Sequence, residues 1–153
     1  MKKKALILLF ALCSMLSALG CSFPRVIVLK DPLTPEEHLN LGVTYEQQGD
    51  FDNAIKEYNL AAKNLPRANL HLGNAYFQKG DWKEAEDFYR KAIEAEPGNA
   101  DAYNNLAWLF YTRKENLDQA EKLAQKAMEL NPGKADVYRD TVEKIRELRR
   151  AFP

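Results

Sequence analysis

The pattern of hydrophobic and polar residues predicts helices from residue 35 to residue 150. It is clearest in the last segment, residues 135–150, where four apolar residues share one helical face and the opposite face is highly charged. These residues are Tyr138, Val142, Ile145 and Leu148. The segment is therefore expected to pack against the rest of the chain on one side only.

Helix-start signals agree with this assignment. Thr34 precedes Pro35, and Glu37 stands three residues after Thr34, which combines an N-cap, a first-turn proline and a reciprocal glutamate. The same three-residue spacing pairs Asp81 with Glu84 and Asn116 with Gln119. We expect capping boxes at all three helix starts.

Three segments of the chain repeat one pattern, in which a Leu followed by Gly or Ala precedes an aromatic residue, several small residues and a Pro. The first series is Leu41, Gly42, Tyr45, Ala54, Tyr58, Ala61 and Pro66. The second is Leu72, Gly73, Tyr76, Ala85, Tyr89, Ala92 and Pro97. The third is Tyr103, Leu106, Ala107, Phe110, Ala120, Ala124, Ala127 and Pro132. Such self-similarity indicates a repeat architecture.

These series resemble the tetratricopeptide repeat, a pair of antiparallel helices of about 34 residues. The resemblance covers residues 35–134, with units at 35–65, 66–99 and 100–134. It implies an all-α fold, a tetratricopeptide-repeat solenoid of three helix pairs, with residues 135–150 as a C-terminal capping helix. Stacking is obligatory in such a fold, because one unit alone cannot bury its apolar face.

The third unit departs from the other two. Its turn, residues 113–116, is one residue longer than the Gly49-Asp50 and Gly80-Asp81 turns, and Ala124 replaces the second aromatic residue. We expect these changes to loosen packing locally without changing the fold.

The N-terminus carries signals for export. Three Lys residues at positions 2–4 precede an uncharged apolar run from Ala5 to Leu19, and this order is typical of a secretion signal. The run ends in Ala18-Leu19-Gly20-Cys21, which resembles the lipobox of bacterial lipoproteins. The resemblance implies that residues 1–20 are a signal peptide and that Cys21 becomes the lipidated N-terminus. The alternative is that Cys21 is an incidental thiol after an ordinary signal.

Residues 21–33 are expected to form a lipidated tether. By resemblance to enterobacterial sorting, Ser22 implies the outer membrane, so the protein is expected in the bacterial cell envelope, facing the periplasm. Within the tether, Val26 to Leu29 form a strand-like apolar run unlike a free linker. This run is expected either to pack on the first helices or to add to a partner's sheet edge.

Composition narrows the chemistry. The chain has 153 residues, with 22 Lys and Arg against 22 Asp and Glu, so it offers no basic field for nucleic acid. Two His and two Cys leave little material for a metal site. The sequence contains no nucleophile elbow, phosphate-cradling loop or zinc-protease motif. We therefore expect no enzyme activity, cofactor or metal.

A concave groove is the remaining candidate site, because in tetratricopeptide proteins the first helix of each unit lines such a groove. The resemblance places there Asn40, Asn74, Phe77, Asn105, Trp108, Tyr111 and Arg139, together with Glu46, and with Glu143 and Arg146 beside Arg139. The Asn side chains can bond an extended backbone, and the aromatic side chains can anchor it as an exposed patch. The alternative is that the Asn residues are a structural habit of the family.

The leading hypothesis is therefore a membrane-anchored scaffold that binds a protein or peptide partner. Residues 31–38, 104–108 and 138–141 also resemble the repeat part of bacterial lipoproteins that carry a papain-like cysteine peptidase domain. This resemblance implies an accessory role beside a separate peptidase. A further alternative is a pilotin-like assembly factor for a secretion, pilus or exopolysaccharide export complex.

Overall fold

The computed structural model of the protein describes residues 31–151, which are entirely helices and connecting turns. The signal segment 1–20, Cys21 and the run Val26 to Leu29 lie outside the described residues. The helices are α2 (Pro35–Gln47), α3 (Phe51–Ala62), α4 (Ala68–Lys79), α5 (Trp82–Ala95), α6 (Ala100–Arg113), α7 (Leu117–Leu130), a short 3-10 helix η1 (Pro132–Lys134) and α8 (Ala135–Ala151). Among the described residues, no helix is long and apolar enough to cross a membrane.

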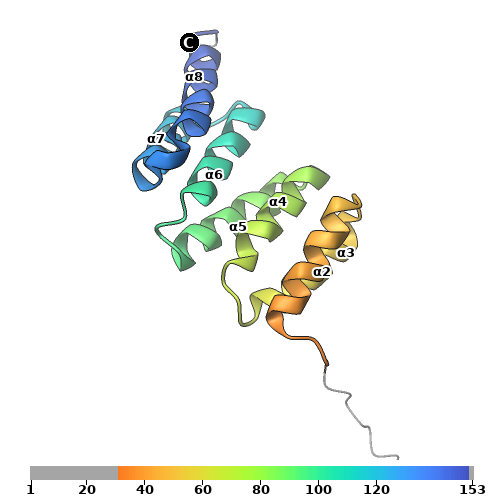
Figure 1. The fold of residues 1–153 in the computed structure, drawn as a ribbon. Coiled ribbons are helices and arrows are strands. Elements are labelled where there is room, and N and C mark those ends of the chain that lie inside the picture. The colour runs from red at the N-terminus through yellow and green to blue at the C-terminus, as the bar shows by residue number, and fades with distance from the viewer. Residues whose placement is uncertain (1–30, 152–153) are drawn as a thin grey trace, which may run out of the picture. The chain divides into compact units, whose positions relative to one another are not determined.

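The helices form three pairs followed by a single helix (Figure 1). Helix α2 packs against α3, α4 against α5, and α6 against α7, and the second helix of each pair packs against the first helix that follows it. Helix α8 packs against both α6 and α7. The predicted all-α solenoid of three helix pairs and a capping helix is confirmed.

Glycine allows the two helices of the first and second pairs to approach closely. A Cβ atom added to Gly42 would lie 2.4 Å from the Tyr58 ring, and one added to Gly73 would lie 2.4 Å from the Tyr89 ring. Both rings are buried against bare backbone. The third pair has Ala107 at the glycine position, and this residue is tolerated because Ala124 replaces the tyrosine on the facing helix.

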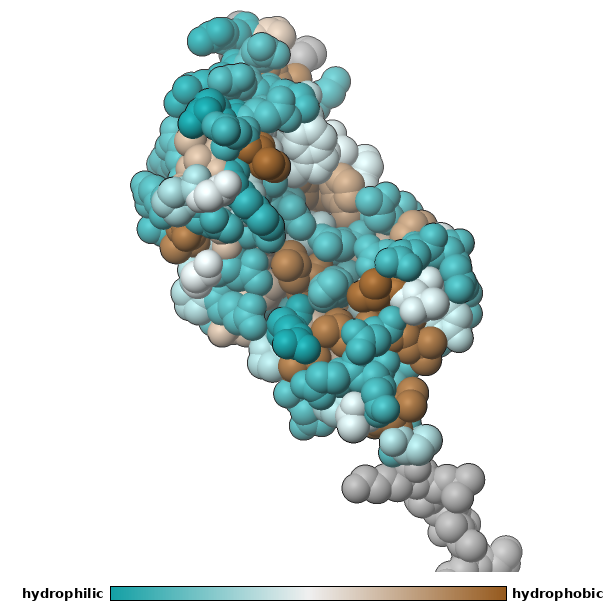
Figure 2. Space-filling model, viewed as in Figure 1, coloured by the Kyte–Doolittle hydropathy of each residue, from teal (hydrophilic) through white to brown (hydrophobic). Residues whose placement is uncertain are grey.

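The core is divided into clusters that cross the pair boundaries. One cluster joins α2, α3 and α4, and a larger one joins residues of α5, α6, α7 and α8. Tyr76 of α4 packs against both clusters and connects them. On the face drawn in Figure 2, hydrophobic patches are small and are separated by hydrophilic residues.

The helix starts follow the sequence signals only in part. The capping box at Thr34 is confirmed, because the Thr34 side chain accepts from the Glu37 N–H and the Glu37 side chain accepts from the Thr34 N–H. The capping boxes expected at Asp81 and Asn116 are wrong, since neither side chain forms the cap hydrogen bond. At Asn116 the cause is its left-handed backbone, with φ of 49°, because an N-cap residue normally adopts an extended conformation.

The longer third turn explains this difference. The first two turns place Gly49 and Gly80 in the left-handed region, whereas the third turn places Lys114 and Asn116 there, with φ of 56° and 49°. Glycine adopts this conformation at little cost, and other residues adopt it less readily. The third turn therefore reverses the chain with more backbone strain than the first two.

Helix α8 closes the solenoid with one buried face. Tyr138, Thr141, Val142 and Ile145 are buried, and Leu148 is half-buried. The Tyr138 hydroxyl donates to Asp101 Oδ1 of α6 at 2.8 Å, and burial, followed by this hydrogen bond, raises the pKa of Tyr138 to about 12. The helix predicted over residues 135–150 is confirmed as a cap.

The close approach at Gly73 predicts a large effect of a small substitution. Gly73→Ala forces a methyl group against the Tyr89 ring, so we expect the free energy of unfolding to fall by about 2 kcal/mol, a value typical of an overpacked core. The matched control is Gly98→Ala, where an added Cβ meets nothing within 4 Å. Its effect is expected to stay below about 0.5 kcal/mol. Urea unfolding followed by circular dichroism measures both, and equal effects would contradict the packing argument.

Candidate functional site

A pocket of about 310 Å³ lies among residues of the first helices of the three pairs. Helices α4 and α6 are in contact, and they supply most of its lining. The lining residues are Glu46 from α2, Asn74, Phe77 and Gln78 from α4, Tyr89 from α5, and Asn105 and Trp108 from α6. Five of the predicted groove residues therefore meet in one pocket: Glu46, Asn74, Phe77, Asn105 and Trp108.

Two amide side chains are fixed against each other in the pocket. Asn105 Nδ2 donates to Asn74 Oδ1 at 2.9 Å, and the Tyr89 hydroxyl donates to the same oxygen at 3.1 Å. Within the described residues, these bonds leave Asn74 Nδ2 as a donor and Asn105 Oδ1 as an acceptor without partners. The Asn74 oxygen therefore has a structural role within the chain.

Glu46 places a negative charge at the pocket. Its carboxylate accepts a hydrogen bond from the hydroxyl of Tyr58, and burial, followed by this bond, raises the pKa of Tyr58. Burial, and after it the charge of Glu46, also raises the pKa of Tyr89. Both tyrosines therefore stay protonated at neutral pH and act as donors.

The predicted aromatic residues are less exposed than expected. Phe77, Trp108 and Tyr111 are half-buried, and Phe77 and Tyr111 pack against the core. The Trp108 and Tyr111 ring centroids are 4.9 Å apart, and Lys144 Nζ of α8 lies 5.2 Å from the Trp108 centroid. Tyr111 does not line the pocket, and its ring packs against the Trp108 ring.

Asn40 and Arg139 are exposed and do not line the pocket. Arg139 Nη1 lies 2.5 Å from Asp136 Oδ1 on its own helix. Arg146, expected to close the groove, instead has its Nε 2.7 Å from Glu121 Oε1 of α7. Because α8 packs against both α6 and α7, only part of its surface faces the groove, and Lys144 lies there.

Sequence reasoning missed three residues of this region: Gln78, Tyr89 and Lys144. Tyr89 lies on the second helix of its pair, and its hydroxyl reaches the first-helix surface because Gly73 lets the ring lie against α4. The Gly73 and Tyr89 spacing was therefore the available signal. No sequence signal distinguishes Lys144 from its charged neighbours on α8.

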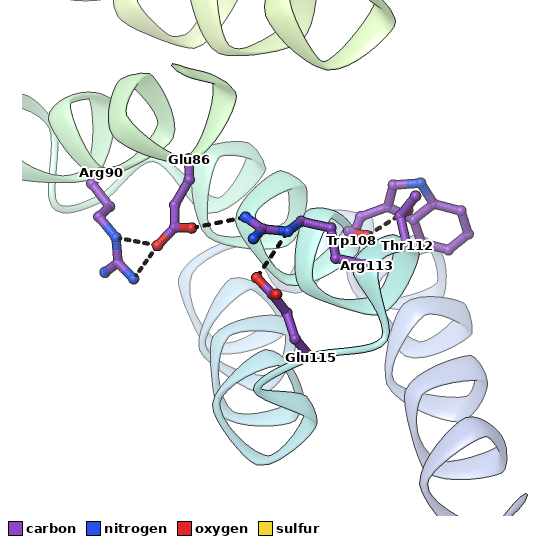
Figure 3. A network of polar contacts seen from close by, with 6 residues as sticks. All are labelled: Glu86, Arg90, Trp108, Thr112, Arg113 and Glu115. Carbon is purple, nitrogen blue, oxygen red and sulfur yellow. Dashed lines mark hydrogen bonds and ion pairs between the residues drawn. The ribbon is translucent and has the colours of Figure 1, made fainter. Parts of the chain in front are cut away.

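A polar network ties α5 to α6 beside this site (Figure 3). Glu86 Oε1 accepts from Arg90 Nη2 at 2.7 Å, and Glu86 Oε2 lies 3.4 Å from Arg113 Nη1. Arg113 Nε also lies 2.9 Å from Glu115 Oε1. In Figure 3, Arg113 extends toward Glu86 and away from the Trp108 indole, so its charge is paired between α5 and α6.

The two histidines lie at helix contacts. His38 Nδ1 lies 2.7 Å from Glu57 Oε2, and the His71 ring packs on the Tyr58 ring with centroids 5.2 Å apart. Burial lowers the pKa of His71, although the charge of Glu46 partly opposes this shift. Among residues 31–151, no group of three His, Cys, Asp or Glu side chains is placed to hold a metal ion.

The chain belongs to the tetratricopeptide repeat family. Its sequence matches that family over residues 27–69, 39–100 and 70–135, which together span residues 27 to 135. The predicted resemblance to this family is confirmed. No significant match was found among curated proteins.

Several solved structures share the fold. The TPR2AB domain of yeast Sti1 in a pHSP90 complex has a TM-score of 0.70 at 24% identity, covering 75% of this chain and 47% of that chain. The TPR2B domain of yeast Sti1 in a pHsp70 complex has a TM-score of 0.70 at 23% identity, with 74% and 96% covered. The first TPR domain of Spaghetti (RPAP3), bound to the HSP90 peptide SRMEEVD, has a TM-score of 0.67 at 20% identity, with 81% and 97% covered. This chain thus spans about half of the Sti1 TPR2AB structure.

The lowered pKa of His71 predicts a pH dependence of stability. The folded state keeps His71 neutral, whereas the unfolded state binds a proton near pH 6.5, so the unfolded state binds more protons below that pH. We expect the free energy of unfolding to fall as the pH drops from 7 to 5. His71→Phe keeps a ring against Tyr58 and removes the proton, so its curve should be flatter over this window. Parallel curves in urea titrations at a series of pH values would contradict this assignment.

Proposed function

We propose that the protein is a non-catalytic scaffold that binds an extended segment of a partner protein in the pocket lined by α2, α4 and α6. The observation that supports this most is the fixed amide pair, which offers Asn74 Nδ2 as a donor and Asn105 Oδ1 as an acceptor. An extended backbone presents N–H and C=O groups in alternation. A donor and an acceptor side by side therefore suit a peptide irrespective of its sequence.

The aromatic residues support the same function. Phe77 and Trp108 line the pocket beside the amide pair and remain half-exposed. Large aromatic side chains at the centre of an interface usually contribute most of its binding energy. A volume of about 310 Å³ lies at the low end for ligand pockets, so it fits one anchoring side chain while the backbone continues outside.

The solved structures support binding as the class of function. Sti1 was solved in pHSP90 and pHsp70 complexes, and Spaghetti with a peptide of HSP90. The Spaghetti peptide, SRMEEVD, carries two Glu and one Asp. The pocket of this chain presents the carboxylate of Glu46, so an acidic peptide of that kind is a poor match here.

We also propose that Cys21 anchors this scaffold to a membrane of the bacterial envelope, with the outer membrane, facing the periplasm, as the expected location. The support is the lysine-rich start, the apolar run and the lipobox-like residues before Cys21. Several acyl chains, at about 0.8 kcal/mol per buried methylene, hold a protein firmly to a leaflet. The pocket would then recruit its partner close to the membrane surface.

The proposed partner is another protein of the bacterial envelope, either an enzyme or a subunit of a larger complex. The resemblance of residues 31–38, 104–108 and 138–141 to peptidase-bearing lipoproteins favours a separate cysteine peptidase. The alternative is a pilotin-like role for a subunit of a secretion, pilus or export complex. Capture of the membrane-bound protein followed by partner identification separates these two possibilities.

The proposed membrane anchor can be tested by substituting one residue. Cys21→Ala removes the acylation site, so we expect the protein to move from the membrane fraction to the soluble fraction when cells are fractionated. Cys13→Ala, inside the signal segment, is the matched control and should leave the protein in the membrane fraction. A Cys21→Ala protein that stays membrane-bound with an unchanged mass would contradict lipid anchoring.

The binding pocket is testable with two tryptophans. Trp108→Ala removes a pocket wall, so we expect the affinity for a crosslinked or captured partner to fall by about 2 kcal/mol or more, as at other interface hot spots. Trp82→Ala is the matched control, because Trp82 is 41% exposed and does not line the pocket. Equilibrium binding measures both variants after circular dichroism has verified folding. Equal affinities of the two variants would place the binding surface elsewhere.

A further inference from the structure

The residues that line the pocket carry charge of one sign, which is negative. Among the described residues that line it, Glu46 alone is charged, and the rest are neutral amides, a protonated tyrosine and two aromatic rings. Lys144 of α8 stands over the Trp108 ring, and its own charge is paired with Asp140 Oδ2 at 2.6 Å. The side chains that line the pocket therefore carry a net negative charge, which favours a cationic group of a ligand.

The carboxylate of Glu46 is only partly compensated. It is half-buried and accepts from the Tyr58 hydroxyl, but within residues 31–151 it forms no ion pair with a Lys or Arg. Removing a carboxylate from water without a counter-charge is unfavourable, and a hydrogen bond from a neutral hydroxyl compensates only part of that cost. A cation supplied by a ligand would provide the missing counter-charge for Glu46.

The rest of the pocket suits a basic side chain as well. Phe77 and Trp108 offer ring faces that an aliphatic stem can cover and that attract a cation. The placement of Lys144 Nζ 5.2 Å from the Trp108 centroid shows that this ring accepts an ammonium group on its α8 side. Asn105 Oδ1 adds one acceptor for an N–H group.

We propose that the partner segment carries a Lys or Arg side chain whose charged head pairs with Glu46 and whose stem lies along Phe77 and Trp108. The Asn74 and Asn105 amides bind the backbone beside that residue. This inference rests on the proposed peptide-binding function and adds the chemical class of the anchor residue. The same charge argument makes a partner segment that is anchored by an acidic side chain a poor match for this pocket.

The test uses the full chain, purified in detergent micelles and immobilised. The probes are four libraries of acetylated and amidated heptapeptides, random except for a central Lys, Arg, Glu or Gln. We expect the Lys and Arg libraries to bind about tenfold more tightly than the Gln library, as for a charge-assisted hydrogen bond, and the Glu library to bind more weakly still. The preference should weaken as salt is raised.

Two variants of equal net charge assign the preference to one residue. Glu46→Gln keeps the size of the side chain and an acceptor for Tyr58. We expect this variant to bind the Lys and Arg libraries no more tightly than it binds the Gln library. Glu94→Gln removes one charge from an exposed position outside the pocket and should leave the preference intact.

The outcomes separate the two proposals. If all four libraries bind equally and Trp108→Ala weakens them all, the pocket binds peptides but the basic anchor is overturned. If Glu46→Gln and Glu94→Gln reduce the preference equally, the charge effect is general and the assignment to Glu46 is overturned. If no library binds, peptide binding and the basic anchor are both overturned.

Discussion

The structure depends on tyrosine rings that lie directly against glycine backbone. This contact sets the distance between the two helices of a pair, and it also carries the ring hydroxyl through to the opposite surface of the first helix. At Gly73 it brings the Tyr89 hydroxyl to Asn74, and in the first pair it brings Tyr58 to Glu46. Packing and site chemistry therefore share the same residues.

The third pair shows what happens without this contact. Ala107 and Ala124 are both fully buried in the same core cluster, so a methyl group replaces bare backbone and a small partner replaces the ring. The pair keeps its packing but loses the tyrosine hydroxyl at that place. Trp108 gives this end of the pocket an apolar wall, supported by Tyr111 and covered by Lys144.

The sequence predicts the fold well because the repeat pattern recurs three times, with one extra residue in the turn of the third unit. The resemblance to the tetratricopeptide repeat also places Asn74, Phe77, Asn105 and Trp108 in one groove, because the first helix of each unit lines that groove. The sequence does not predict the hydroxyl of Tyr89 in the pocket, because this requires the path of a ring between two helices. The capping box predicted at Asn116 is wrong, because the left-handed backbone there overrides a favourable residue type.

The lining of the pocket comes from all three helix pairs, and this gives any occupant a mechanical role. A segment bound to Glu46, Asn74 and Asn105 would bridge α2, α4 and α6. Without it, these three helices are connected mainly through α3 and α5, the second helices of the first two pairs. Free energy gained on binding then appears as resistance to separation of neighbouring repeats. Binding of a partner segment and the stability of the helix stack are therefore thermodynamically coupled.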